Sequence, residues 1–294
     1  MYAELHEHVI MDAVNYRKAM DRHKDGVDKE YVRSVLQTYK DYDITFIRDG
    51  GDFAGVGEYA QTIAPEYGIE YITPIFALHH KGYYGSVVGF PYSTYKEFED
   101  YVKQIKKRGG NFVKIMTTGL LDFGVYGVIT EGALTVSEIK ELVNIAHGEG
   151  FAVMSHTNGA QNVKNAVEGG VDSVEHGSYM DDDAISYLAQ SGTLWVPTIS
   201  TQTNLLRTER YPHDVVKKIS DEDFSNIVKA IRLGANVGVG SDAGAYAVPH
   251  GSGTMDEYGY IREAAGDEET FNKLVDRSIK YVRERFIGPN STAS

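Results

Sequence analysis

The chain has 294 residues, and its 29 lysines and arginines against 42 aspartates and glutamates give a formal net charge of −13. This acidic balance disfavours nucleic acid and anionic lipid as partners, because both are bound through clustered positive charge. The sequence contains no cysteine, which excludes disulfides, thiolate metal sites, iron–sulfur clusters and cysteine nucleophiles.

Short apolar segments alternate with longer amphipathic segments about eight times along the chain. In chain order, the apolar segments predict strands over residues 2–5, 44–48, 70–78, 112–116, 152–155, 173–175, 193–199 and 237–240. The amphipathic segments predict helices over residues 29–40, 58–67, 94–108, 136–148, 160–168, 221–233, 255–265 and 270–285, and the aspartates at 181–183 open a further helix. Thr94 and Glu97 have the spacing of a capping box.

Eight strand–helix units indicate an α/β fold, a (β/α)8 barrel, in which the strands are almost continuously apolar because both of their faces are buried. The alternative is a doubly wound sheet, which normally carries a glycine-rich motif directly after the first strand. Here the glycine cluster at 50–57 follows the second strand and is typical of a turn. We expect a single domain over residues 1–287 and a flexible tail over residues 288–294.

Candidate functional side chains lie at the ends of several predicted strands, where a barrel places its chemistry. His6 and His8 are two residues apart in the first strand, so both point into the barrel mouth while Glu7 faces outward. Later strands contribute a lysine, two histidines and an aspartate: Lys114, His156, His176 and Asp242.

Each of these residues also has a structural explanation when taken alone. A strand-end histidine can be hydrogen-bonded, a lysine can extend its amine to water, Asp242 can cap a turn, and Glu175 can be the partner of His176. Together, imidazoles and a carboxylate form a suitable donor set for zinc or a similar divalent ion. Lys114 fits such a cluster if its pKa is lowered and its neutral amine reacts with carbon dioxide, since the resulting carbamate can bridge two ions.

The sequence resembles the amidohydrolase superfamily of metal-dependent hydrolases over essentially the whole chain. The resemblance rests on the paired histidines of the first strand and on four short motifs: FVKIM around Lys114, SHTNG around His156, VEHG around His176 and GSDAG around Asp242. The flanking sequences at 47–51 and 248–251 are similar to the branch that contains Xaa-Pro and Xaa-Arg dipeptidases and imidazolonepropionase-like enzymes. Two departures are the apparent lack of the accessory β-sandwich that many relatives carry, and Glu4 where relatives usually have aspartate.

The resemblance implies a binuclear metal centre. His6, His8 and Asp242 would bind one divalent ion, His156 and His176 would bind the other, and carboxylated Lys114 and a hydroxide would bridge them. Zinc is the expected metal, with manganese, iron(II) or cobalt as alternatives. In this scheme hydroxide attacks the scissile carbonyl, and Asp242 accepts its proton and delivers that proton to the leaving nitrogen.

Substrate contacts are expected near the same strand ends. The resemblance implies that His80 polarises the substrate carbonyl, although His79 and His80 could equally be solvent-exposed loop residues. Arg48 could bind a substrate carboxylate or form a structural pair with Asp49. His250 and Tyr126 are further candidate contacts, and Arg207 and Arg210 are expected at the surface.

The predicted function is hydrolysis of an amide-type C–N bond in a dipeptide, an N-acyl amino acid or a small cyclic amide. A lactonase or phosphotriesterase using the same centre is the enzymatic alternative, and a catalytically silent barrel subunit is the alternative outside enzymes. No apolar segment approaches the roughly 20 residues of a membrane span, and the opening residues are too polar for a secretory signal. We therefore expect a cytoplasmic protein with a small-molecule substrate and no nucleic-acid or membrane partner; a homo-oligomer remains open.

Overall fold

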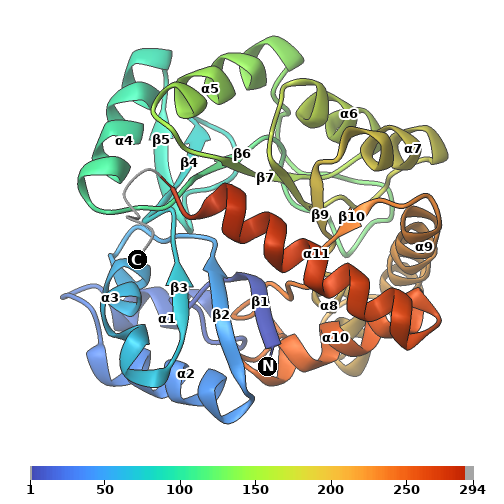
Figure 1. Cartoon of the computed structure of the whole chain (residues 1–294), viewed down its shortest axis with the longest axis horizontal. Helices are drawn as coiled ribbons and strands as arrows, with labels where there is room; N and C mark the ends of the chain where they lie inside the picture. Colours follow the sequence, from blue (N-terminus) through green and yellow to red (C-terminus); the bar gives the residue numbers. More distant parts are fainter. Residues whose placement is uncertain (1, 289–294) are drawn as a thin grey trace.

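The computed structural model describes residues 2–288 as parallel strands surrounded by helices (Figure 1). The strands are β1 (Tyr2–Glu7), β2 (Ile44–Asp49), β3 (Glu70–Ile72), β4 (Ala77–His80), β5 (Gly89–Tyr92), β6 (Val113–Met116), β7 (Val153–Thr157), β8 (Ser173–His176), β9 (Leu194–Val196) and β10 (Asn236–Val237). The α-helices are α1 (Tyr16–Arg22), α2 (Lys29–Asp41), α3 (Val56–Ile63), α4 (Tyr95–Lys107), α5 (Val136–Gly148), α6 (Ala160–Glu168), α7 (Asp182–Ser191), α8 (Ser200–Thr203), α9 (His213–Arg232), α10 (Ser252–Ala265) and α11 (Glu268–Phe286). Two 3₁₀ turns, η1 (Ala64–Tyr67) and η2 (Asn204–Arg207), complete the set.

The strands form two parallel sheets that are joined in barrel order. One sheet has the order β1-β2-β3 and the other the order β10-β9-β8-β7-β6-β4-β5. β3 pairs with β2 and β4 pairs with β6, so the short segment between β3 and β4 links the two sheets. On the other side, Leu5 N donates to Val239 O at 3.1 Å and Asp242 N donates to His6 O at 2.7 Å, which brings the segment after β10 beside β1. This is the strand order of the predicted (β/α)8 barrel.

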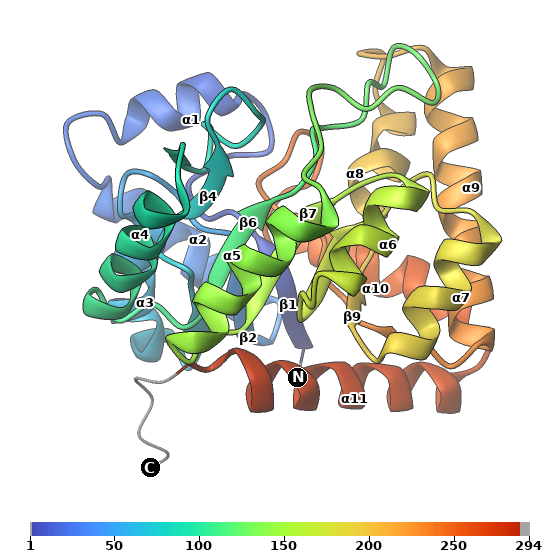
Figure 2. The same ribbon diagram turned by 90° about the horizontal axis from the view of Figure 1, so that it is seen from above.

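Helix α11 lies across the amino-terminal ends of the strands (Figure 2). Its residues Val282 and Phe286 are fully buried and pack in one cluster with strand residues that include Leu5, Phe46 and Met154. A larger cluster fills the layer between the strands and the surrounding helices. Since α11 covers the amino-terminal end, the loops at the carboxyl-terminal end are left to form a site.

Several element boundaries differ from those expected. The predicted strand over residues 70–78 is interrupted between β3 and β4, where Ile75 adopts φ 67°. Helix α9 begins at residue 213 rather than 221 because Val216 and Ile219 are also buried. The capping box at α4 is incomplete, since Thr94 accepts from Glu97 N but the Glu97 carboxylate accepts from Ser93 N.

Helix α1 and strand β5 were not predicted. Apart from Gly288, the predicted tail lies outside the described residues. The sheets described between residues 2 and 288 include no β-sandwich. No helix in that range is both long enough and apolar enough to cross a membrane.

Candidate metal centre

The first group of candidate ligands meets where β1 lies beside the segment that follows β10. One donor atom from each of His6, His8 and Asp242 lies within 4.8 Å of the other two. Asp242 Oδ1 is 3.8 Å from His6 Nε2 and 3.7 Å from His8 Nε2. These separations are too long for direct hydrogen bonds and leave room for an ion between the three side chains.

A glycine from the predicted turn makes space for this group. A β-carbon at Gly50 would lie 2.2 Å from the nearest atom of the His8 ring. Gly50 follows β2, and its N donates to Glu7 O at 2.7 Å, which holds the turn against β1. The absence of a side chain at residue 50 is therefore a packing requirement of His8.

The second group of candidate ligands adjoins the first. The ring centroids of His156 and His176 are 4.5 Å apart, and those of His6 and His176 are 5.1 Å apart. His156 lies in β7 and His176 ends β8, where its backbone has φ 68°. Four imidazoles from three strands thus form one continuous cluster.

Lys114 is buried beside these histidines without a hydrogen-bond acceptor. Its side chain is 1% exposed, and its Nζ has no partner among the described residues. Burial lowers the pKa of Lys114 to about 8. Asp242 Oδ1 is likewise buried without a donor. Unpartnered buried amines and carboxylate oxygens are costly, so these two atoms indicate that the centre is incomplete without a bound group.

One nitrogen of each imidazole ring contacts a neighbouring polar atom, which fixes the ring. The other nitrogen of each ring has no hydrogen bond among the described residues. His6 Nδ1 lies 2.7 Å from Glu175 Oε2, His8 Nδ1 lies 3.1 Å from Gly51 O, and His176 Nδ1 lies 2.7 Å from Thr198 Oγ1. For His156 the bonded atom is Nε2, 3.0 Å from Gly119 O. Such contacts orient the rings of metal-binding histidines.

Burial also keeps these imidazoles neutral. It lowers the pKa values of His8 and His156 to about 3, and it lowers those of His6 and His176 well below the usual value. A neutral imidazole is the form that binds a metal ion. The four imidazoles therefore fit divalent ions in both composition and protonation.

Arg48 does not contact the pocket, contrary to its expected role in substrate binding. It is fully buried, and its guanidinium donates to Leu5 O at 2.7 Å, to Ser173 Oγ at 3.0 Å and to both carboxylate oxygens of Glu175 at 2.9 and 3.0 Å. Glu175 is thus the partner of Arg48 and His6 rather than of His176. The alternative pair of Arg48 with Asp49 is also absent, because Asp49 accepts from Thr73 Oγ1.

The other predicted substrate contacts are held by neighbouring residues and are not among the residues that line the pocket. His79 is buried with its Nδ1 3.1 Å from His80 O, and the His80 ring packs against Tyr83. His250 is held by Tyr39 OH and Met11 O, each at 2.9 Å. Tyr126 donates its hydroxyl to Glu222 on α9. The pocket wall includes none of His79, His80, His250 or Tyr126.

One pocket of about 710 Å³ contains all six candidate ligands: His6, His8, Lys114, His156, His176 and Asp242. Its walls come from the loops after the strands, and Tyr84 is among them with its ring 5.1 Å from that of His156. Arg17 and Arg210 also line it. Arg210 is exposed, as expected, but its place in the loop after the seventh predicted strand puts it at this pocket.

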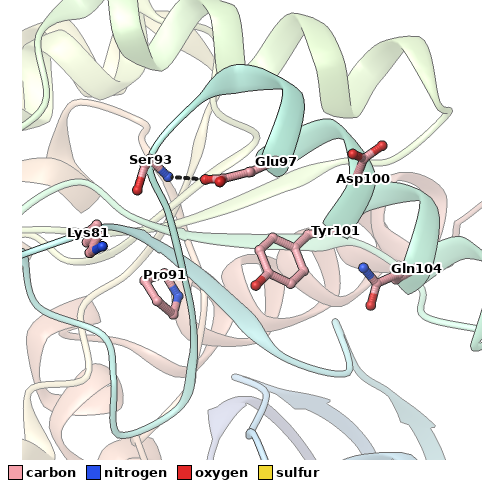
Figure 3. A pocket seen from close by; sticks show the side chains of 7 residues that line it. All are labelled: Lys81, Pro91, Ser93, Glu97, Asp100, Tyr101 and Gln104. Atoms are coloured by element: carbon pink, nitrogen blue, oxygen red, sulfur yellow. Dashed lines mark hydrogen bonds between the residues drawn. The ribbon is translucent and has the colours of Figure 1, made fainter.

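A second, shallower hollow lies between strands β4 and β5 and helix α4 (Figure 3). Lys81, Glu97 and Asp100 line it together with Tyr101, and Ser93 N donates to the Glu97 carboxylate at 2.7 Å. The hollow includes none of the candidate site residues.

Comparisons with known proteins give one family model and several partial relatives. The amidohydrolase family model matches residues 48–274. An uncharacterised protein of Mycobacterium tuberculosis is 27% identical over 119 residues, which cover 38% of this chain and 32% of that protein. Ochratoxinase from Aspergillus niger is 23% identical over 147 residues, which cover 46% of this chain and 29% of the enzyme. The chain therefore matches about a third of the length of these curated relatives.

Solved structures match nearly the whole chain. A Xaa-Pro dipeptidase with bound methionine has a TM-score of 0.73 at 23% identity, covering 99% of this chain and 77% of its own. Aspergillus niger ochratoxinase has a TM-score of 0.75 at 18% identity, covering 98% and 71%. A prolidase from Bifidobacterium longum, described as putative, has a TM-score of 0.70 at 19% identity, covering 96% and 69%. At these identities the likeness establishes the barrel fold.

Proposed function

Because the chain belongs to the amidohydrolase family, we propose that it is a metal-dependent hydrolase that cleaves an amide-type C–N bond. The observation that carries this proposal is the meeting of six candidate ligands in one pocket, with Lys114 Nζ and Asp242 Oδ1 buried and unpartnered. The dipeptidase, prolidase and ochratoxinase likenesses support amide-type substrates.

We assign the ligands to two ions. His6, His8 and Asp242 would hold the first, and His156 and His176 would hold the second. The neutral amine of Lys114 would add carbon dioxide and release a proton to solvent, and the resulting carbamate anion would be suited to hold both ions. Zinc suits the histidine-rich donor set, and manganese, iron(II) or cobalt are the alternatives. Bound ions would lower the pKa of a water molecule and polarise a carbonyl group.

The residues of the chain supply orientation and proton transfer. Arg48 and Glu175 hold the His6 ring at its Nδ1 side. The Asp242 carboxylate would accept a proton from the attacking nucleophile and deliver it to the leaving nitrogen, which leaves poorly unless protonated. Tyr84, which is partly buried, lines the pocket beside the buried candidate ligands. His80 receives no step, since it lies outside the pocket wall.

The pocket is of a size that suits a small molecule, and we propose such a substrate, with no nucleic-acid or membrane partner. The net charge of −13 supports the exclusion of nucleic acid. A cytoplasmic location remains a prediction.

The test is the metal content per chain, measured by elemental analysis on protein produced with zinc or with manganese. We expect about two ions in the wild type, a sharp fall in Lys114→Ala, and no change in Lys140→Ala, which alters an exposed lysine of α5. A single ion that is unaffected by Lys114→Ala would contradict the binuclear assignment. A panel of dipeptides and N-acyl amino acids, run beside lactones and phosphotriesters, then tests the bond; turnover of only the latter two would overturn the amide assignment.

A further inference from the structure

We propose that Arg210, assisted by Arg17, binds a carboxylate group of the substrate and so determines which amides the pocket accepts. The inference rests on the proposed function for the identity of the bond that is cleaved. The expectation that the substrate carries an anionic group rests on the residues at the pocket mouth.

The charge of the pocket wall is the first observation. Among the described residues that line this wall, Asp242 is the only carboxylate and belongs to the candidate metal centre, whereas two are arginines. A chain of net charge −13 thus presents positive side chains at this pocket. Cationic side chains in a concave site raise the local concentration of anionic ligands.

The lack of protein partners for these two arginines is the second observation. Arg207, three residues before Arg210, forms an ion pair with Asp256 at 2.8 Å. Within residues 2–288, Arg210 has neither an ion pair nor a hydrogen bond, and Arg17 has only a hydrogen bond from its Nε to Tyr16 OH at 3.1 Å. Most of the other arginines in this range are paired with carboxylates, so the pocket arginines retain donors for a ligand.

Aromatic contacts orient the Arg210 side chain. Its guanidinium carbon lies 4.3 Å from the ring centroid of Tyr246 and 5.4 Å from that of Tyr211, and both tyrosines line the same pocket. A guanidinium above a ring face keeps its N–H groups in its own plane. Two N–H groups in that plane can donate parallel hydrogen bonds to one carboxylate.

The rim beside these arginines is apolar. Val14, Tyr16, Leu120 and Tyr246 are large hydrophobic residues that are exposed and also line the pocket. Single exposed hydrophobic residues need no explanation, but their gathering at the mouth of one pocket indicates an apolar ligand. The substrate class is therefore an amide that carries a free carboxylate and a bulky apolar group.

The test measures binding by calorimetry to the full chain after metal removal, so that the probe neither binds an ion nor is hydrolysed. The probes are N-acetyl-L-phenylalanine and its C-terminal amide, which differ in the carboxylate. We expect the acid to bind the wild type about tenfold tighter than the amide, and to lose this advantage in Arg210→Met and at high salt. Arg232→Met is the matched control, because Arg232 is exposed, lacks an ion pair in the described chain and lies outside the pocket.

Three outcomes would overturn the inference. The wild type could bind the two probes with equal affinity, or bind neither measurably. The advantage of the acid could also survive both Arg210→Met and Arg17→Met. Turnover by the metal-loaded protein separates it from the proposed function. If acids and their amides are hydrolysed equally well, the carboxylate subsite is refuted and the hydrolase remains. If neither is hydrolysed but the binding preference persists, the subsite remains and the amide hydrolase is refuted.

Discussion

The buried pair of Arg48 and Glu175 makes the sharpest energetic prediction. Both side chains are fully buried, and Arg48→Met removes donors to Leu5 O, to Ser173 Oγ and to both oxygens of Glu175. Breaking a buried pair by removing one partner costs about 3–5 kcal/mol, because the remaining charge stays buried. We expect Arg48→Met to lower the free energy of unfolding by this amount, measured by denaturant titration of the metal-free chain.

A double-mutant cycle separates the pair from general damage. Arg48→Met combined with Glu175→Gln should cost roughly 1–3 kcal/mol less than the sum of the single changes. The control is Arg207→Met, whose exposed pair with Asp256 should be worth less than about 1 kcal/mol. A loss in Arg48→Met no larger than that in the control would refute the reasoning. Because Glu175 orients His6, Arg48→Met should also weaken metal binding about 10–100-fold.

Two further predictions concern single positions. Gly50→Ala places a β-carbon 2.2 Å from the His8 ring, so bound metal should fall sharply by elemental analysis, while Gly148→Ala, in open space on a helix, should leave it unchanged. Burial raises the pKa of Asp223 to about 7. As pH rises, Asp223 therefore ionises in the unfolded chain before it ionises in the folded one. The free energy of unfolding should fall between about pH 4 and 7, by at most about 4 kcal/mol. In denaturation measured across this pH range, Asp223→Asn should flatten the decline, and the exposed Asp221→Asn should not. Equal slopes of the unfolding free energy against pH in the wild type and Asp223→Asn would contradict this prediction.

Two helices, α5 and α6, begin and end at the predicted residues, although no side chain caps the start of α6. Helix α5 spans the predicted residues 136–148, and its first turn has a complete capping box between Thr135 and Glu138. The strand predicted over residues 70–78 fails at its centre, because a continuous apolar run does not reveal that Ile75 adopts a positive φ. Periodicity reports which face is buried but not where the backbone turns within a buried run.

Most of the candidate ligands were predictable because they lie in strands or directly after them, whereas Asp242 lies well beyond the end of β10. The partners of Arg48 were not predictable, because Glu175 is 127 residues away and a sequence does not say which buried acid a buried arginine will meet. The same limit applies to Arg210. The path of the loop after β9 places this residue at the pocket, and the sequence does not reveal that path. Substrate contacts lie on loops, and loops lack the periodicity that orders the strands.

Three residues at the candidate centre have left-handed backbone conformations. His176 has φ 68° and Asp242 has φ 60°, and Thr198, which holds His176 Nδ1, has φ 50°. Residues other than glycine rarely adopt this region of backbone φ, and each one that does costs about 1–3 kcal/mol. The unpartnered Lys114 Nζ and Asp242 Oδ1 lie in the same pocket. A bound group that contacts these side chains would offset the cost of both the strain and the unsatisfied polar atoms.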